Sequence, residues 1–443
     1  MPQQTILLAK IIMLKKKALT NALFFAGVLT AGAQSVDPSS TVNSPYTRYG
    51  LGDLSEQVFA NNAAMGGVGY ALRTSEHINP MNPASYTAVD SLSFMFDVGM
   101  SLKSSNFQEG KYKSNAKNSS FDYLVMQFRL HPRLGFALGY TPFSTVGYNF
   151  NRSKPVDGDK DVNITNTFFG DGNTQQIFAG LGFKILDNLS VGANISYLYG
   201  KLNYRTSANL DNGGDQTANY QKLSVSSYKA DFGVQYTQTI DKNNSLTLGL
   251  AYGLGHQLNC TYTTGTQVAD VTGNSNYIQT TEEIKRDGFG IPHTIGAGVA
   301  WNHANKLNVE VDYSLQKWSG VKYNDRTDLY NNRSKVAFGA EYLPKAHGRN
   351  YLARIKYRVG AYYTSPYLKV PYQGGMIDGP KEYGVSAGFG FPLSLNMRNS
   401  VLSITGQYVH VSPSVNGMLS ENRFVIKLGL TFNERWFMKW RVN

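Results

Sequence analysis

Residues Leu307–Leu315 read LNVEVDYSL, and apolar or aromatic residues alternate with polar ones along the whole stretch. Side chains of a β-strand point alternately to the two faces of a sheet, so this pattern predicts a strand with one apolar and one charged face. The charged face carries Glu310 and Asp312, and the other face carries Val311 and Tyr313. An amphipathic helix would need a period of about 3.6 residues, which the stretch lacks.

The same alternation recurs along most of the chain. In Tyr351–Tyr363, YLARIKYRVGAYY, one face holds Arg354, Lys356 and Arg358, and the other holds apolar and aromatic residues. Fourteen such segments are predicted, an even number, as single-chain bacterial outer-membrane barrels have. The predicted strands are 90–104, 120–131, 134–143, 175–185, 189–204, 227–239, 245–259, 293–302, 307–320, 333–343, 351–363, 382–391, 400–411 and 422–432.

The composition also points to a membrane β-barrel. Charged residues make up 16% of the 443, against about 25% in ordinary soluble domains. Aromatic residues reach 13%, there are 44 glycines, and the single cysteine, Cys260, allows no internal disulfide. After the first 33 residues no apolar run approaches the roughly 18 residues that a transmembrane helix needs. Membrane strands, which alternate, fit this composition better than membrane helices.

The predicted connections alternate between short and long, as barrels with short periplasmic turns and long extracellular loops require. A propeller would show a repeat of about 40 residues, and none is found. A soluble sandwich would carry more Lys and Glu on its outer face. The short connections are 131–133, 185–188, 240–244, 302–305 and 344–350, and the long ones are 105–119, 144–174, 205–226, 260–292, 321–332, 364–381 and 412–421.

The first 33 residues have the form of a secretory signal peptide: a Lys15–Lys17 cluster, an apolar Leu19–Leu29 stretch and Ala31-Gly32-Ala33. The alternative is an N-terminal membrane anchor, for which the apolar stretch is short. Cleavage would remove four of 42 basic residues and no acidic one, leaving 38 − 30 = +8. This charge is scattered, which does not indicate nucleic-acid binding. We predict an N-terminal extension and hatch (34–88), a barrel (89–432) and a periplasmic tail (433–443).

Residues Ala63–Tyr86, AAMGGVGYALRTSEHINPMNPASY, resemble the N-terminal region of FadL-type (TodX-like) outer-membrane transporters for long-chain fatty acids and other hydrophobic compounds. The resemblance rests on the small Met-Gly-Gly stretch followed by Asn82-Pro83-Ala84, and it continues diffusely through segments such as LGYTPFSTVGY at Leu138–Tyr148. It implies an all-β, 14-stranded antiparallel transmembrane β-barrel in a Gram-negative outer membrane. It also implies an N-terminal hatch in the lumen and a kinked third strand that opens the wall toward lipid.

Two segments depart from the family pattern. They are Ser44–Leu54, SPYTRYGLGDL, before the hatch region, and the tail NERWFMKWRVN after the last predicted strand. Either Ser44–Leu54 or Trp436–Asn443 could bind another outer-membrane or periplasmic protein. Some relatives of the family are accessory parts of export machinery, so these departures favour a specialised role.

The predicted hatch and gate residues are Asn82, Pro83, Ala84 and Pro142. The first three would hold the hatch against the third strand, although they could equally form a turn into the first strand, because Asn-Pro initiates turns. Pro142 removes a backbone donor and would weaken the wall, unless it only begins the next loop.

A second candidate site is the inward face carrying Arg354, Lys356 and Arg358. Glu310 and Asp312 face inward two strands away, and Lys335 and Glu341 face inward on the strand between. Opposite charges inside a narrow barrel favour ion pairs that brace the wall. The alternative is that an arginine grips a ligand carboxylate. The seven histidines show no metal-ligand spacing, and no nucleophile–base pair is recognisable, so we predict neither metal, cofactor nor enzymatic activity.

Two functions are compatible with these patterns. The first is passive uptake of hydrophobic small molecules such as fatty acids, through a hatch-gated lumen with lateral exit into membrane lipid. The second is an accessory or structural subunit of an outer-membrane assembly or secretion complex. An apolar cavity behind the hatch would favour uptake, whereas a lumen packed with paired charges would favour the subunit. A general polar porin is disfavoured because a hatch would block it.

Overall fold

The computed structural model describes residues 44–156, 159–211, 216–269, 278–286, 288–346, 348–393 and 400–435. The predicted signal peptide and the tail Trp436–Asn443 lie outside these residues. Among the described residues, no helix is long and apolar enough to cross a membrane.

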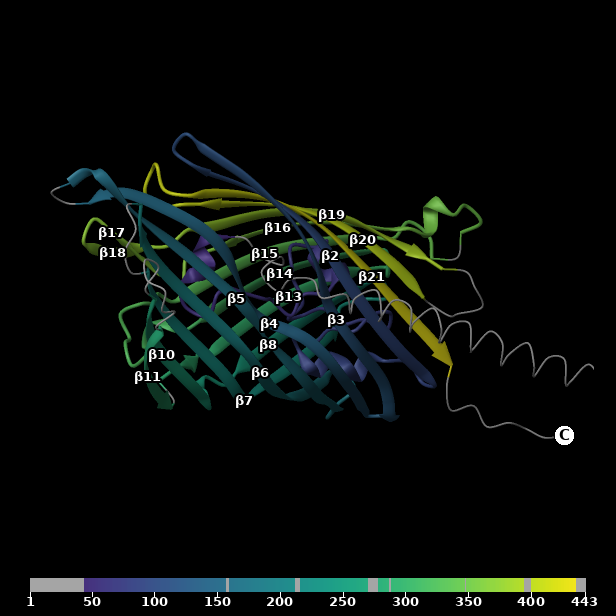
Figure 1. Ribbon diagram of the computed structural model, residues 1–443. Helices are drawn as coiled ribbons and strands as arrows, with labels where there is room; N and C mark the ends of the chain where they lie inside the picture. The colour runs from purple at the N-terminus through teal and green to yellow at the C-terminus, as the bar shows by residue number, and fades with distance from the viewer. Residues whose placement is uncertain are drawn as a thin grey trace, which may run out of the picture.

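The chain forms a closed antiparallel barrel of fourteen strands, as predicted (Figure 1). Each strand pairs with the next along the chain, and the last pairs with the first over Ser93–Gln108 and Ser420–Arg435. The strands are β2 (Ser93–Glu109), β3 (Tyr112–His131), β4 (Leu134–Val156), β5 (Asp159–Lys184), β6 (Leu189–Leu210), β7 (Gln216–Thr239), β8 (Asn244–Gly253), β13 (Thr294–His303), β14 (Leu307–Gln316), β15 (Arg333–Tyr342), β16 (Lys356–Thr364), β19 (Lys381–Pro392), β20 (Val401–Ser412) and β21 (Ser420–Arg435).

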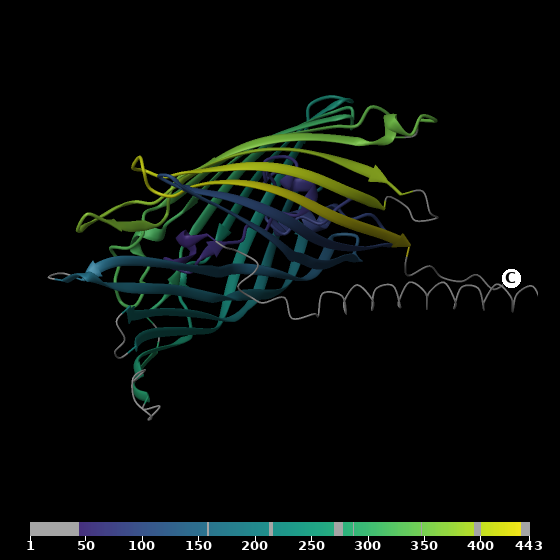
Figure 2. The ribbon, with the colours of Figure 1, turned by 45° about the horizontal axis from the view of Figure 1, so that its top comes forward.

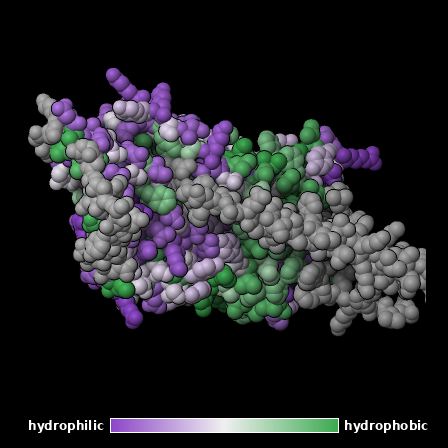
Figure 3. Space-filling view, viewed as in Figure 1, coloured by the Kyte–Doolittle hydropathy of each residue, from purple (hydrophilic) through white to green (hydrophobic). Residues whose placement is uncertain are grey.

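The alternation in LNVEVDYSL corresponds to side chains that point alternately into the lumen and out of the barrel. Glu310 and Asp312 on β14 point into the lumen and are 0% and 4% exposed, whereas Val311 and Tyr313 are 49% and 48% exposed on the outside. On the face seen in Figure 3, side chains of this outer kind form a hydrophobic band across one part of the barrel, beyond which the surface is hydrophilic. Exposed apolar side chains occur on strands all round the barrel, such as Leu181, Leu250 and Val385. An apolar band around a barrel is the surface that faces lipid.

Three of the predicted long loops are instead strand extensions. Residues 105–119, 144–174 and 205–226 continue the hairpins β2–β3, β4–β5 and β6–β7 well beyond the apolar band. Within 260–292, β10 (Cys260–Ala269) pairs with β7, and β11 (Ile278–Arg286) pairs with β10. These extensions lie at the end with the long connections, which in outer-membrane barrels faces the outside. The outer face meets water there instead of lipid, so the apolar outer face that marks a membrane strand disappears.

Residues 44–89 run through the lumen, and we call them the luminal segment; it is purple in Figures 1 and 2 and lies inside the ring of strands in both views. It contains η2 (Pro45–Arg48), the two-residue strand β1 (Asp53–Leu54), the short helix α2 (Ala60–Ala63) and η3 (Pro83–Ala88). The role of this segment as a movable hatch stays a prediction.

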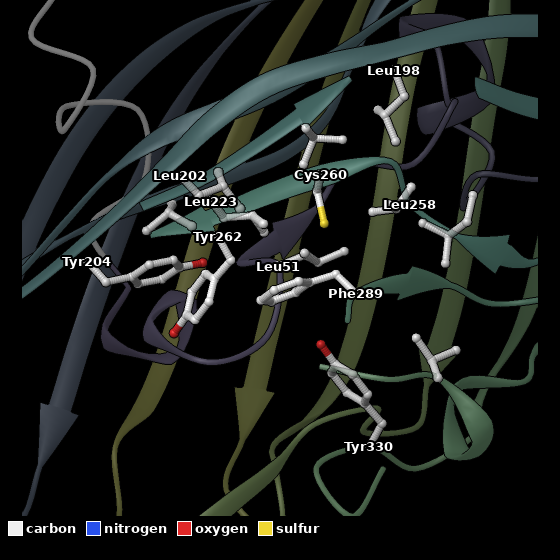
Figure 4. Close-up of a cluster of buried hydrophobic side chains, with 14 of the residues drawn as sticks. Leu51, Leu198, Leu202, Tyr204, Leu223, Leu258, Cys260, Tyr262, Phe289 and Tyr330 are labelled. Atoms are coloured by element: carbon white, nitrogen blue, oxygen red, sulfur yellow. The ribbon is translucent and has the colours of Figure 1, made fainter. Parts of the chain in front are cut away.

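The outer half of the lumen is filled by an apolar and aromatic cluster (Figure 4). Leu51 of the luminal segment lies among side chains from β6, β7 and β10, including Leu202, Leu223 and Tyr262. The connecting elements β9 (His256–Gln257), β12 (Gly290–Ile291) and η4 (Trp318–Gly320) cover it, and β17 (Lys369–Tyr372) and β18 (Gly375–Asp378) form a further hairpin. The luminal segment is therefore anchored in a hydrophobic core at its outer end.

Candidate functional site

Inward-facing glycines let the luminal segment lie directly against the wall. A methyl group on Gly249 of β8 would lie 1.9 Å from the Tyr70 carbonyl oxygen, and one on Gly360 of β16 would lie 2.0 Å from the Gly66 nitrogen. Comparable clashes with luminal backbone would occur at the wall positions Gly135, Gly182, Gly192 and Gly339. Since these glycines come from strands on different sides of the barrel, the segment fits the lumen as a closely packed insert.

We expect Gly249→Leu to destabilise the folded barrel, because its side chain would overlap the backbone at Tyr70. Overpacking of this kind costs about 1–3 kcal/mol. The temperature at which the barrel unfolds, followed by its gel migration after stepwise heating, should fall. Gly406→Ala is the matched control, since its nearest neighbour is 4.0 Å away. Equal unfolding temperatures for both variants would contradict the close packing.

The asparagines of the two Asn-Pro pairs, Asn79-Pro80 and Asn82-Pro83, make different hydrogen bonds. Asn79 donates from its amide nitrogen to the carbonyl oxygens of Gly69 (2.6 Å) and Leu72 (3.1 Å), which folds the luminal segment back on itself. The amide nitrogen of Asn82 lies 2.8 Å from the Tyr70 carbonyl oxygen of the segment itself, and 3.1 Å and 3.2 Å from the carbonyl oxygens of Val234 on β7 and Leu250 on β8. Asn82 therefore fixes the segment to the wall.

The local chain order explains how Asn82 reaches this position. Asn82 is the N-cap of η3, its side-chain oxygen accepts from the Ala84 nitrogen at 3.1 Å, and Pro83 occupies the first position of the helix. Proline is favoured there because its missing N–H would have no helical partner. Gly233 on β7 leaves room, since a methyl group on it would lie 2.0 Å from the Asn82 side-chain oxygen.

The sequence predicted that Asn82, Pro83 and Ala84 contact the third strand, which is β4, but the structure shows a different contact there. Asn82, Pro83 and Ala84 lie against β5 to β8, and η3 reaches β4 where the Tyr86 carbonyl approaches Gly135 near the start of that strand. The segment that lies along the middle of β4 is Ser44–Leu54, whose role the sequence left open. The structure therefore does not bring Asn82, Pro83 and Ala84 together with Pro142.

The wall opens beside Pro142. β3 pairs with β4 over Leu124–His131 and Leu134–Tyr140; beyond this level, β3 pairs with β2 and β4 with β5. A register shift on each side, at Gly99/Met100 in the β2–β3 pair and at Pro142/Ser144 in the β4–β5 pair, marks the same level. Bulges bend strands and increase their twist. We call the resulting separation of β3 from β4 the seam; the two hairpins diverge in Figures 1 and 2.

Pro142 lies within β4, which continues to Val156. The sequence had suggested that Pro142 lies at the end of this strand. Its position at the bulge agrees with the confinement of strand prolines to edges and irregularities. Whether this opening gates passage stays a prediction.

The luminal segment covers part of the seam. In β1, Asp53 and Leu54 pair with Thr145 and Ser144 of β4, and the Ser55 nitrogen donates to the Phe143 carbonyl oxygen at 2.9 Å. Ser44, Thr47 and Gly50–Gly52 in the same stretch are buried. Much of Ser44–Leu54 is thus used inside the protein, which disfavours it as a free docking surface for a partner.

Lys356 and Arg358 point into the lumen and are paired. The Arg358 Nε lies 2.6 Å from Glu341 Oε2, and Lys356 forms ion pairs with Glu341 (3.4 Å) and with Glu76 of the luminal segment. Arg354 is not on this face, since it lies on η5 (Leu352–Arg354) before the strand begins, so its predicted place in the ladder was wrong. The arrangement favours bracing for Lys356 and Arg358, and a ligand role for them stays a prediction.

Glu310 and Asp312 accept hydrogen bonds from backbone nitrogens of the luminal segment, and they do not pair with the arginines as predicted. Asp312 Oδ2 accepts from the Gly69 nitrogen at 2.7 Å and from Tyr70 at 3.0 Å, and Glu310 Oε1 accepts from Ala71 at 2.9 Å. The charged face of LNVEVDYSL thus binds the middle of the luminal segment.

A cavity of about 510 Å³ lies between the luminal segment and the wall and reaches the seam. The charged side chains among its lining are Lys103, Arg333, Lys335, Arg423, Lys427, Asp53, Glu56, Asp122 and Glu382. Most of them are paired; Arg333 lies 3.3 Å from Glu56, Lys335 also pairs with Glu56, and Arg423 lies 3.3 Å from Glu382. A second cavity of about 160 Å³, near Met81, Phe143 and Trp318, has a more apolar lining. The lining of the larger cavity mixes charged side chains with apolar and aromatic ones.

Glu56 belongs to the luminal segment and ties it to this charged wall. Burial alone would raise the pKa of Glu56, but the positive charges of Lys335 and Arg333 outweigh it and lower that pKa to about 2. A carboxylate with a lowered pKa stabilises the fold above its ordinary pKa, and this contribution is lost as the pH falls through the lowered value.

We therefore expect Glu56→Gln to destabilise the barrel at pH 7. The difference from the wild type should shrink as the pH falls from about 4.5 toward 2, because the wild-type carboxylate then loses its charge. Urea unfolding of both proteins in lipid vesicles at several pH values measures this difference in the free energy of unfolding. Glu109→Gln is the control, because Glu109 forms an exposed pair with Arg152, and exposed pairs contribute little. A difference that is constant from pH 7 to pH 2 would count against the Glu56 ion pairs.

The fold and the luminal segment define the class of protein: an outer-membrane β-barrel with the architecture of FadL-type channels. Solved structures that share it include the CymD monoaromatic hydrocarbon channel (TM-score 0.58, 14% identity, 86% of this chain and 98% of that one). A Pseudomonas aeruginosa FadL homologue matches with TM-score 0.58 and 13% identity (87% and 100%), and the Pseudomonas putida toluene transporter TodX with 0.59 and 13% (87% and 99%).

The chain belongs to the BamG family, whose model matches residues 13–443. No curated protein sequence matches it. At 13–14% identity, the likeness to the solved channels is a likeness of fold.

Proposed function

We propose that this barrel serves as an accessory or structural subunit of an outer-membrane protein assembly or secretion complex. The observation that carries the proposal is the set of paired charges that lines the cavity at the seam. The cavity at the seam is walled by the ion pairs of Glu56 and Arg423, and the luminal segment beside it is bound to the wall by Asn82, Glu310 and Asp312.

A cavity lined by paired charges is a poor route for a hydrophobic compound. Such a compound would gain little by leaving lipid for a space in which charged groups would have to lose their water or their partners. The same ion pairs are well suited to keeping the barrel rigid. Membership of the BamG family, a name that hints at protein partners, supports the same proposal.

Lateral passage of a hydrophobic compound is the second candidate. The seam beside Pro142 favours it, as does the fold shared with channels for monoaromatic hydrocarbons and toluene. The compound would enter at the outer end, cross the cavity and leave through the seam into lipid. Long-chain fatty acids are the substrate class that the sequence resemblance suggested.

Native purification separates the two candidates. We expect a protein tagged in the exposed β17–β18 turn, at Gln373-Gly374, to co-purify in mild detergent with a stoichiometric outer-membrane or periplasmic partner, as read by native mass spectrometry. Deleting the gene should leave the uptake of radiolabelled toluene and oleate unchanged. Recovery of a monomer alone, together with a clear loss of uptake in the deletion strain, would overturn the subunit proposal and favour passage.

A further inference from the structure

At the periplasmic end of the barrel, the connection between β15 and β16 is longer than a hairpin needs. It runs over residues 343–355, which we call the periplasmic loop. In Figures 1 and 2 it is the green loop with a short helix that stands out beyond the strand ends. Barrels of this kind usually have short turns on this side. The other connections at this end are residues 132–133, 185–188, 240–243, 304–306 and 393–400.

The periplasmic loop has a defined conformation. The Lys345 nitrogen donates to the Ala353 carbonyl oxygen at 2.8 Å. The Tyr351 hydroxyl donates to the carbonyl oxygen of Pro392 on β19 at 3.3 Å, and the Arg354 guanidinium lies 5.2 Å from the centre of the Tyr351 ring. A loop that is already held in one conformation loses less entropy when it binds a partner.

The periplasmic loop is basic, and so are the connections beside it. Its sequence, LPKAHGRNYLARI, contains Lys345, Arg349 and Arg354 and no Asp or Glu. The neighbouring connections, 304–306 and 393–400, contain one lysine and one arginine, again without a carboxylate. Lys345 and Arg349 are exposed, and neither forms an ion pair with the part of the chain that the structure describes.

The carboxylates around this region already have partners. Glu341, near the end of β15, faces the lumen and pairs with Lys356 and Arg358. Asp241, in the connection between β7 and β8, accepts two backbone N–H groups of its own turn at 2.7 and 2.8 Å. Glu434, near the end of β21, is also engaged. The exposed cations of the periplasmic loop are therefore available to a negatively charged partner.

The position of the loop favours a protein over the membrane surface as this partner. Tyr342, the last residue of β15, is 49% exposed on the outside, and aromatic residues at strand ends mark the boundary of the bilayer. The periplasmic loop begins at the next residue and carries Tyr351 and Leu352, which are 42% and 60% exposed. Arginine and tyrosine are enriched in protein interfaces, where they often contribute most of the binding energy.

We propose that the periplasmic loop docks onto an acidic surface of a periplasmic partner protein. Lys345 and Arg349 pair with carboxylates of the partner, and Tyr351 and Leu352 supply the apolar contact. Complementary charges of this kind speed association and exclude wrong partners. The inference rests on the proposed subunit function, and it names the surface that the partner binds and the charge that the partner carries.

Charge reversal tests the chemistry of this surface. In the tagged full-length protein, the Lys345→Glu, Arg349→Glu double variant should recover about tenfold less partner than the wild type, because attraction becomes repulsion. Arg133→Glu, Lys242→Glu is the matched control, since both residues are exposed in other periplasmic connections, and it should recover the wild-type amount. Lys345→Arg, Arg349→Lys keeps the charges and should do the same. Gel migration after stepwise heating checks that each variant folds.

Photo-crosslinking in intact cells tests the contact itself. p-Benzoylphenylalanine is placed at Arg349 and, in a second strain, at Asn350 of the full chain. Both positions should form adducts with the protein that co-purifies, as identified by mass spectrometry. Asn243, which is exposed in the connection between β7 and β8, is the control and should not join that protein.

The outcomes distinguish the two proposals. If the partner co-purifies equally well with the charge-reversed variant, or if the control double variant loses it to the same extent, docking at the periplasmic loop is wrong and the subunit proposal stands. Adducts with only phospholipid, or with a second copy of this chain, lead to the same conclusion. If the wild type recovers no partner, both proposals fall.

Discussion

A polypeptide backbone inside a barrel must find a partner for each N–H and C=O group that it hides from water. In this protein the wall supplies many of those partners to the luminal segment. Glu310 and Asp312 accept from three successive nitrogens, while the Thr405 hydroxyl and the Gln407 amide donate to the carbonyl oxygens of Ala60 and Ala63. The wall glycines allow the backbone to come this close. The same contacts that satisfy the segment also fill the lumen.

Because the luminal segment occupies much of the lumen, the charges and openings that remain determine which function the barrel can have. The ion pairs of Glu56 and Glu76 join the luminal segment to β15 and β16, and Glu341 of β15 pairs with Lys356 of β16. Glu56 and its partners on β15 line the cavity at the seam. The wall nevertheless opens at the seam, where β1 covers part of β4. A lumen occupied by the chain's own segment supports the proposed subunit role over the passage of a hydrocarbon.

The sequence predicted the wall better than its contents. The alternation in LNVEVDYSL follows from one face meeting lipid, so it revealed the strand count. Residues 144–174 were taken for a loop because the outer face of an extension in water is polar. The apolar residues Tyr351, Ala353 and Ile355 extended the strand pattern across η5 and misplaced Arg354. The partners of Asn79 and Asn82, and the addition of Asp53 and Leu54 to β4, depend on contacts between distant residues that no local pattern encodes.

Backbone hydrogen exchange in the native membrane tests most directly whether the luminal segment is a fixed part of the barrel. The amides of Gly69, Tyr70 and Ala71, which donate to Asp312 and Glu310, should exchange as slowly as those in the middle of β14. Exchange of these amides within seconds, while the β14 amides stay protected, would show a segment that leaves the wall readily, and would contradict the account of a filled and fixed lumen.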